Sequence, residues 1–203
     1  MMLEKVKGKF GIDVSENNGC VDWKAVKEAG VDFAIIRLGY GNRHLDRKFY
    51  CNVNGALEAG LKIGVYYYSY ALDIEDAETE AHFMVDILRD CGLTTDELEM
   101  GVWFDMEDAD GYKKRYSVTD SETLTEICIA FTSVCEIRGY KCGVYASYDW
   151  LANRLDTSLL SDVPIWCAQW GEDCEWEDAL LWQYTDALEI DGHVFDGNIC
   201  REV

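Results

Sequence analysis

The chain has 203 residues, of which 49% are hydrophobic, and its 39 Asp and Glu against 18 Lys and Arg give a net charge of −21. Such an acidic balance argues against electrostatic binding to nucleic acid or to anionic lipid. The length suffices for one substantial core, so we expect a single domain over residues 1–203. No stretch approaches the ~20 apolar residues of a membrane span, and we expect the domain to bind neither nucleic acid nor membrane.

Residues 1–9 carry charges but no apolar run of the kind found in a signal peptide. We expect this segment to be a short extension before the first strand. A protein with such a start is kept in the cell, leaves it by lysis, or has lost a signal peptide.

Short apolar runs alternate along the chain with amphipathic stretches, the pattern of repeated β-α units. The apolar runs predict eight strands, at residues 10–14, 33–38, 62–70, 101–106, 141–146, 164–169, 180–184 and, more weakly, 193–195. The amphipathic stretches predict helices at residues 23–29, 49–59, 74–89 and 122–138. After residue 150 only one short helix, at 150–155, is expected, so the later strands must be joined by loops or hairpins.

This order of elements predicts an α/β fold, a single-domain distorted (β/α) barrel whose helices are regular in the first half and reduced or missing in the second. No glycine-rich phosphate loop follows the first strand, which argues against an open, nucleotide-binding sheet. In barrels of this kind the functional residues lie at the C-terminal ends of the strands.

Two carboxylates end the fourth predicted strand, in Trp103-Phe104-Asp105-Met106-Glu107-Asp108. Side chains alternate faces along a strand, so Asp105 and Glu107 point the same way. A carboxyl pair at the end of a buried strand is costly in free energy and indicates acid/base chemistry. The alternatives are a divalent metal site, or rim residues that bond backbone amides or pair with Arg37 or Arg115.

Two further acidic residues are expected at the same rim: Asp13 ends the first strand, and Asp196 follows the last. The first and eighth strands are neighbours in a closed barrel, so Asp13 and Asp196 can approach each other. The four carboxyls would then line one acidic pocket.

Aromatic residues also gather at these strand ends. Flat apolar faces with polar tips suit the faces and hydroxyls of sugar rings, although each residue could instead fill the barrel. The predicted substrate-binding residues are Tyr66, Tyr68, Trp103, Tyr145, Trp166 and Trp182.

The nine cysteines are odd in number and form neither CxxC pairs nor a His/Cys cluster. Cys128 and Cys135 fall on one helical face, and Cys142 and Cys167 lie in apolar strands, which favours buried, reduced thiols. We expect no metal and no cofactor.

An ordered series of motifs spans nearly the whole chain: Gly11-Ile12-Asp13-Val14-Ser15, Asn18-Gly19, Val21-Asp22-Trp23, Phe33-Ala34-Ile35-Ile36-Arg37-Leu38-Gly39-Tyr40-Gly41, Gly64-Val65-Tyr66-Tyr67-Tyr68-Ser69, Asp105-x-Glu107, Gly143-Val144-Tyr145-Ala146-Ser147, Ile165-Trp166-Cys167-Ala168-Gln169-Trp170, Trp182-Gln183-Tyr184 and Asp196-Gly197-Asn198. This series resembles family 25 of the glycoside hydrolases, the N-acetylmuramidase type of lysozyme. Two departures concern subsite detail: Tyr67 stands where many members have His, and Arg37-Leu38-Gly39 replaces the Lys-x-Ser/Thr of some branches.

The resemblance implies a distorted β/α barrel that cleaves the β-1,4 bond between N-acetylmuramic acid and N-acetylglucosamine in bacterial peptidoglycan, outside the cell and on the wall. By position Glu107 resembles the general acid and Asp105 its acidic partner, while Asp13 and Asp196 resemble the carboxylates that flank the cleft. We expect a monomer that retains the anomeric configuration, with Asp105 and Asp196 stabilising a substrate-assisted or covalent intermediate. The alternatives are a non-catalytic barrel that binds wall glycan and a glycosidase acting on chitin-like polymers.

Overall fold

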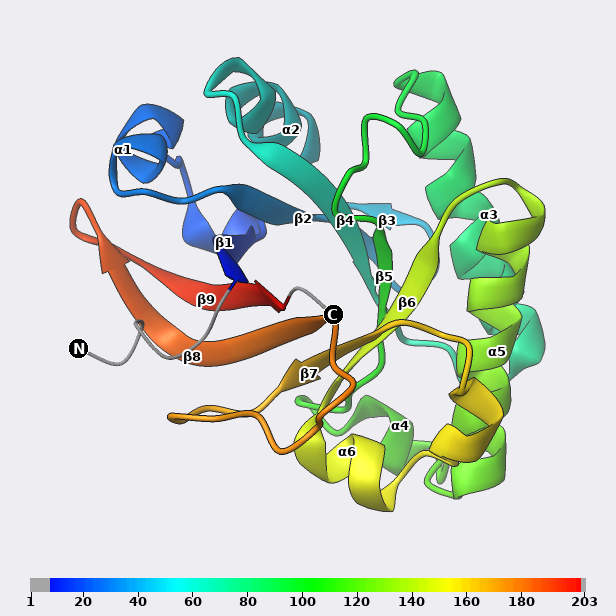
Figure 1. Ribbon diagram of the computed structural model, residues 1–203. Coiled ribbons are helices and arrows are strands. Elements are labelled where there is room, and N and C mark those ends of the chain that lie inside the picture. Colours follow the sequence, from blue (N-terminus) through cyan, green and yellow to red (C-terminus); the bar gives the residue numbers. More distant parts are fainter. Residues whose placement is uncertain (1–7, 202–203) are drawn as a thin grey trace.

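The first strand pairs on both sides and thereby closes a barrel (Figure 1). In the computed structural model, which describes residues 8–201, β1 (Gly8–Val14) runs parallel to β2 (Phe33–Tyr40) and antiparallel to β9 (His193–Arg201). The parallel strands continue from β2 through β4 (Lys62–Tyr68), β5 (Val102–Asp105), β6 (Cys142–Ser147) and β7 (Ile165–Ala168) to β8 (Leu181–Ile190). The two-residue strand β3 (His44–Leu45) pairs with the end of β2. The result is a mixed barrel of eight strands, as predicted.

Helices cover mainly the first half of the barrel. The four predicted helices are confirmed as α1 (Trp23–Glu28), α2 (Phe49–Glu58), α3 (Ile74–Asp90) and α5 (Ser121–Ile137). Aspartates start three of them: Asp22, Asp73 and Asp120 each accept backbone N–H groups of the first turn. The remaining helical turns are short, namely η1 (Glu16–Asn18), α4 (Tyr112–Arg115), α6 (Tyr148–Asn153) and η2 (Thr157–Leu160). Within residues 8–201, no helix has the length and apolar character needed to cross a membrane.

The last two strands form an antiparallel hairpin, which lies across the barrel from α3 and α5 (Figure 1). The prediction of a strand at 193–195 was too short, because β9 extends to Arg201. Its apolar alternation is broken by Gly197 and Asn198, and Asn198 is fully buried among polar partners. Asp196 is therefore inside a strand that runs back toward the start of β1, and the prediction that it follows the last strand was wrong.

The expected extension at residues 1–9 lies mostly outside the described residues, which begin at Gly8. Gly8 and Lys9 are already part of β1, where they pair with Arg201 and Cys200.

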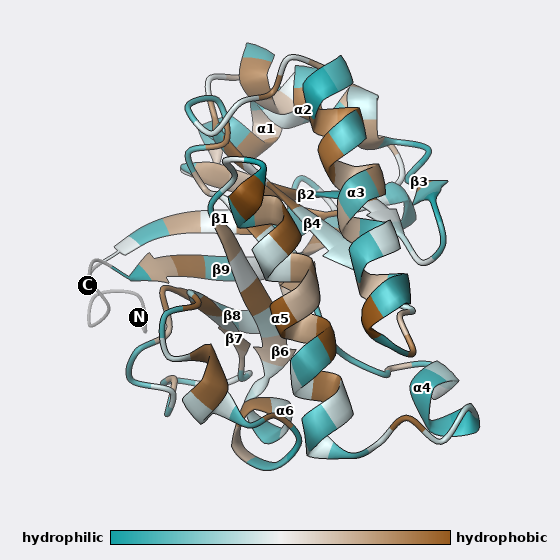
Figure 2. Ribbon diagram, turned by 90° about the vertical axis from the view of Figure 1, so that its right-hand side faces the viewer, coloured by the Kyte–Doolittle hydropathy of each residue, from teal (hydrophilic) through white to brown (hydrophobic). Residues whose placement is uncertain are grey.

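Two apolar clusters hold the barrel together. The larger one lies between the sheet and its helices, and Figure 2 shows its apolar residues on the strands and on α5. The smaller one fills the barrel interior with Phe33, Ile35, Trp103, Trp166 and Leu181. The predicted burial of Cys128, Cys135, Cys142 and Cys167 is confirmed. Above the inner cluster the barrel interior becomes polar, and this change marks the floor of a cavity.

Candidate active site

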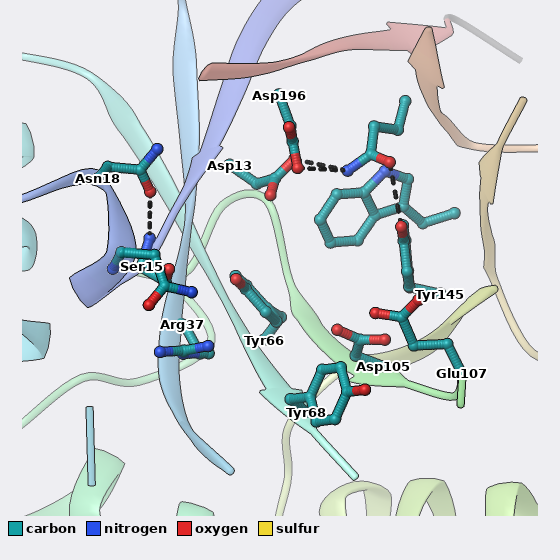
Figure 3. Close-up of a pocket in the computed structure, with 13 residues that line it drawn as sticks. Asp13, Ser15, Asn18, Arg37, Tyr66, Tyr68, Asp105, Glu107, Tyr145 and Asp196 are labelled. Carbon is teal, nitrogen blue, oxygen red and sulfur yellow. Dashed lines mark hydrogen bonds between the residues drawn. The ribbon is translucent and has the colours of Figure 1, made fainter. Parts of the chain in front are cut away.

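A cavity of about 320 Å³ opens at the C-terminal ends of the parallel strands (Figure 3). All four predicted catalytic carboxyls line it, contributed by β1, by β5 and the residues just after it, and by β9. Its lining residues are Asp13, Ser15, Asn17, Asn18, Arg37, Tyr66, Tyr68, Asp105, Glu107, Tyr145, Trp166, Gln183 and Asp196. Residues 183 positions apart in the chain thus meet in one site, because the barrel closes between β1 and β9.

Asp13 and Asp196 form the first carboxyl pair. They occupy the same register position of the antiparallel pair β1–β9. Two side-chain amides hold Asp13: its Oδ2 accepts from Asn198 Nδ2 at 2.8 Å and from Gln183 Nε2 at 3.0 Å. Gln183 Nε2 also reaches Asp196 Oδ2 at 3.4 Å. The predicted approach of Asp13 to Asp196 is confirmed.

Burial makes this pair hold a proton. Burial, followed by the neighbouring charge of Asp196, raises the pKa of Asp13 to about 8, although the amides of Asn198 and Gln183 act in the opposite direction. The pKa of Asp196 is also raised, mainly by burial. The hydrogen bond between the two carboxyls raises the pKa of Asp13 and lowers that of Asp196, so Asp13 is the member of the pair that keeps its proton to higher pH.

Asp105 and Glu107 form the second pair, on a different side of the cavity from Asp13 and Asp196 (Figure 3). Asp105 is the last residue of β5 and is 5% exposed, whereas Glu107 lies two residues beyond the strand and is more accessible. Asp105 Oδ1 is buried and finds no hydrogen-bond partner among residues 8–201. A buried carboxyl oxygen left unpartnered in a cavity is costly, which indicates that it serves a ligand.

Desolvation again shifts both groups. It raises the pKa of Asp105 well above its usual range, with the charge of Glu107 adding to the effect. It also raises the pKa of Glu107, where Lys113 opposes the shift and Asp196 adds to it. Since two carboxyls in one desolvated cavity resist ionising together, the pair retains a proton as the pH rises, and it titrates as a unit.

Four of the six predicted aromatic residues line the cavity: Tyr66, Tyr68, Tyr145 and Trp166. Tyr145 donates its hydroxyl to Gln183 Oε1 at 3.0 Å, and Trp166 donates its indole N–H to Asn198 Oδ1 at 2.8 Å. Trp166 therefore joins the inner apolar cluster to the amides that hold Asp13. The aromatic and carboxyl groups form one connected layer.

The other two predicted residues, Trp103 and Trp182, are not brought to this cavity. Trp103 points inward but lies one layer deeper. Its ring packs against Gly143, and its indole N–H donates to the Met100 carbonyl at 2.7 Å. Trp182 faces the outer cluster, because the inward positions of β8 are taken by Leu181 and Gln183. Strand alternation separates Trp182 from the site, and depth in the barrel separates Trp103 from it.

The sequence prediction missed five polar lining residues: Ser15, Asn17, Asn18, Arg37 and Gln183. A signal existed for two of them. Arg37 follows Ile35 by two positions on β2, and Gln183 follows Leu181 by two on β8, so each continues an inward-facing row into the polar layer. Ser15 and Asn18 form a capping box that starts η1 at the rim, which only the turn geometry reveals.

Neither alternative for the Asp105 and Glu107 pair gains support from the described side chains. Arg37 is engaged elsewhere, since its Nε donates to Asp46 Oδ2 at 2.8 Å and its Nη2 lies 3.6 Å from Glu16 Oε1. Arg115 lies over the ring of Tyr112. Within residues 8–201, no group of three or more His, Cys, Asp or Glu has the arrangement of a metal site.

Comparison with known proteins agrees with this geometry. The profile of the family described as glycosyl hydrolases family 25 matches residues 12–193. The autolytic lysozyme of Clostridium acetobutylicum is 28% identical over 186 residues, which cover 90% of this chain and 52% of that protein. The chain thus spans about half the length of this relative.

Solved structures share the fold. The modular autolysin LytC of Streptococcus pneumoniae, solved in complex with a synthetic peptidoglycan ligand, aligns with a TM-score of 0.83 at 28% identity, over 95% of this chain and 46% of that one. The lysozyme of Streptomyces coelicolor aligns with a TM-score of 0.79 at 21% identity, over 97% of this chain and 93% of that one.

Proposed function

The chain belongs to glycosyl hydrolase family 25, and from this premise we propose that it is a lysozyme that cleaves the β-1,4 bond between N-acetylmuramic acid and N-acetylglucosamine in bacterial peptidoglycan. The observation that carries the proposal is the meeting of Asp13, Asp105, Glu107 and Asp196 in one cavity at the strand ends. The peptidoglycan ligand bound by LytC supports the choice of substrate. Residues 1–203 then act as one catalytic unit on the wall, outside the cell.

Glu107 is the proton donor in this proposal. It stands beyond the end of β5 and is the more accessible member of its pair, so it can reach the glycosidic oxygen. Its raised pKa keeps the proton available at higher pH than an ordinary glutamate allows. The proton passes to the leaving oxygen as the bond from that oxygen to the anomeric carbon breaks.

The electron-deficient anomeric carbon is then attacked by the 2-acetamido oxygen of the substrate itself. Asp105 lies beside Glu107 on the same strand end rather than across the sugar, and its unpartnered Oδ1 can accept the acetamido N–H and balance the developing positive charge. Asp196 adds negative charge from the other side of the cavity. Water, deprotonated by Glu107, opens the cyclic intermediate, and the configuration is retained.

The aromatic residues bind the sugar rings. Tyr66, Tyr68 and Tyr145 present ring faces and hydroxyls to the same volume as the carboxyls, with Trp166 below them. Their arrangement excludes water from the glycosidic bond and orients that bond toward Glu107.

The rival functions are a barrel that binds wall glycan without cutting it and a glycosidase of chitin-like polymers. A suspension of purified peptidoglycan separates the first rival from the proposal. Wild-type protein should clear the turbidity, whereas Glu107→Gln should bind the sediment without clearing it. If wild-type protein binds and the turbidity stays constant, the protein is a binding module.

A further inference from the structure

Lys113 is a buried cation that the reaction described above does not use. It lies in the four-residue helix α4 and is 1% exposed, although its neighbours Lys114 and Arg115 are exposed. The Asp108 carboxylate fixes the turn by accepting the backbone N–H of Lys113 at 2.7 Å and of Lys114 at 3.1 Å. This turn directs the Lys113 side chain inward.

The ammonium group ties together two strand ends. Lys113 Nζ donates to the carbonyl of Ser69, directly after β4, and to the carbonyl of Glu107 at 3.2 Å. Backbone hydrogen bonds between the strands fix the chain as far as Met106 and Ser69. The Met106 N–H donates to the Tyr145 carbonyl, and the Ser69 N–H donates to the Asp105 carbonyl. Beyond these bonds, Lys113 anchors the main chain that carries the Glu107 side chain.

The same cation faces titratable groups from each element packed around it, of which three are carboxyls and one is a thiol. Glu80 on α3, Asp105 on β5, Asp108 after β5 and Cys128 on α5 all act on it electrostatically. Glu80 is itself buried, and its Oε1 accepts the Tyr70 N–H at 2.9 Å. A buried ammonium needs such partners, because an isolated charge is costly in the interior.

We propose that Lys113 is a positioning residue of the Asp105 and Glu107 pair: it anchors the main chain of Glu107 and supplies positive charge to both carboxyls from behind the cavity wall. Glu80 partly cancels this charge and so tunes it. The inference rests on the proposed function for its kinetic test, but the geometry concerns the carboxyl pair alone.

The direction of the effect follows from the charges. Lys113 lowers the pKa of Asp105 and of Glu107, against the raising effects of burial and of Asp196, Asp108 and Asp110 around Glu107. Removing the ammonium should raise both. Burial raises the pKa of Glu80 to about 7, so Glu80 is charged mainly above that pH, and its removal should lower the pKa of the pair there.

The test is the pH profile of kcat/KM for Lys113→Met and Glu80→Gln. Lys113→Met should move both limbs to higher pH by roughly one unit, with a loss of about tenfold on the acidic limb. Glu80→Gln, which keeps an oxygen for Tyr70 N–H, should move the basic limb to lower pH. The matched control Lys114→Met removes an equal charge from an exposed position of the same helix and should leave both limbs in place.

A purely structural role would lower kcat without these opposed shifts. Unchanged limbs in a folded Lys113→Met would overturn the proposal, and if that variant does not fold, unchanged limbs in Glu80→Gln would do so. Carbon NMR titration of the carboxyls in wild type and Glu80→Gln measures the pKa shifts of the pair directly, without turnover. An inactive wild type would thus refute the proposed function, while carboxyl pKa values that stay unshifted in a folded Lys113→Met, titrated in the same way, would refute the role of Lys113.

Discussion

Asp13 and Asp196 face each other at one register position of the strand pair that closes the barrel, and the side-chain amide of Gln183 donates to both. The fold thus places two carboxyl groups where strands from opposite ends of the chain meet. Their proximity is tolerated because they share a proton, and this sharing has a measurable consequence for stability.

The free energy of unfolding should fall as the pH rises from 5 to 8. Asp13 has a pKa of about 8 in the folded protein against 3.8 as its ordinary value, so its contribution is complete below pH ~4 and is lost as the pH approaches 8. Glu80, with a pKa of about 7, acts in the same direction.

Asp13→Asn isolates this contribution. The amide oxygen can accept from Asn198 and Gln183 while the amide nitrogen donates to Asp196, which imitates the protonated acid. The decline of stability with pH should be shallower than in wild type by about 1 kcal/mol per pH unit. Urea unfolding of both proteins at pH 5, 6, 7 and 8 measures the free energy of unfolding. Parallel declines of this free energy in the two proteins would show that Asp13 ionises normally.

Trp103 and Trp166 should respond differently to substitution, because only Trp166 reaches the cavity. Trp103→Phe leaves a gap against Gly143 and should cost about 1–3 kcal/mol of stability with little change in kcat/KM. Trp166→Phe removes the bond to Asn198 and should lower kcat/KM about tenfold. Equal kinetic losses in both variants would place Trp103 in contact with substrate after all.

How far the sequence predicts the site depends on which residues obey strand alternation. The barrel, its four long helices and the four carboxyls followed from apolar periodicity and from the motifs. The hairpin register did not, because Gly197 and Asn198 interrupt the apolar pattern of β9, and Asn198 is buried for its bonds to Asp13 and Trp166. Lys113 gave no signal at all: it is the first of three consecutive basic residues in a short turn, and only the fold shows that its side chain points inward.

Chelation should leave activity unchanged. The amide nitrogens of Gln183 and Asn198 point at Asp13 and would repel a cation there, and both carboxyl pairs retain protons. Dialysis against EDTA, followed by the peptidoglycan turbidity assay, tests this expectation. Loss of activity that returns with Ca²⁺ or Mg²⁺ would favour the metal alternative for Asp105 and Glu107.

Hydrolysis should proceed with retention. Whether the acetamido oxygen or an aspartate attacks the anomeric carbon, two successive displacements occur, and the first product has the β configuration. Proton NMR of a short peptidoglycan glycan during cleavage detects the anomer before it equilibrates. An α product would exclude both routes and require Glu107 and a second carboxyl to act across a water molecule.

The reducing ends released from purified peptidoglycan test the central claim most directly. After borohydride reduction, mass spectrometry should find fragments of the wild-type digest that end in reduced N-acetylmuramic acid, and Glu107→Gln should release none above background. Fragments that end in reduced N-acetylglucosamine, or wild-type yields from Glu107→Gln, would contradict the assignment of a muramidase with Glu107 as its proton donor.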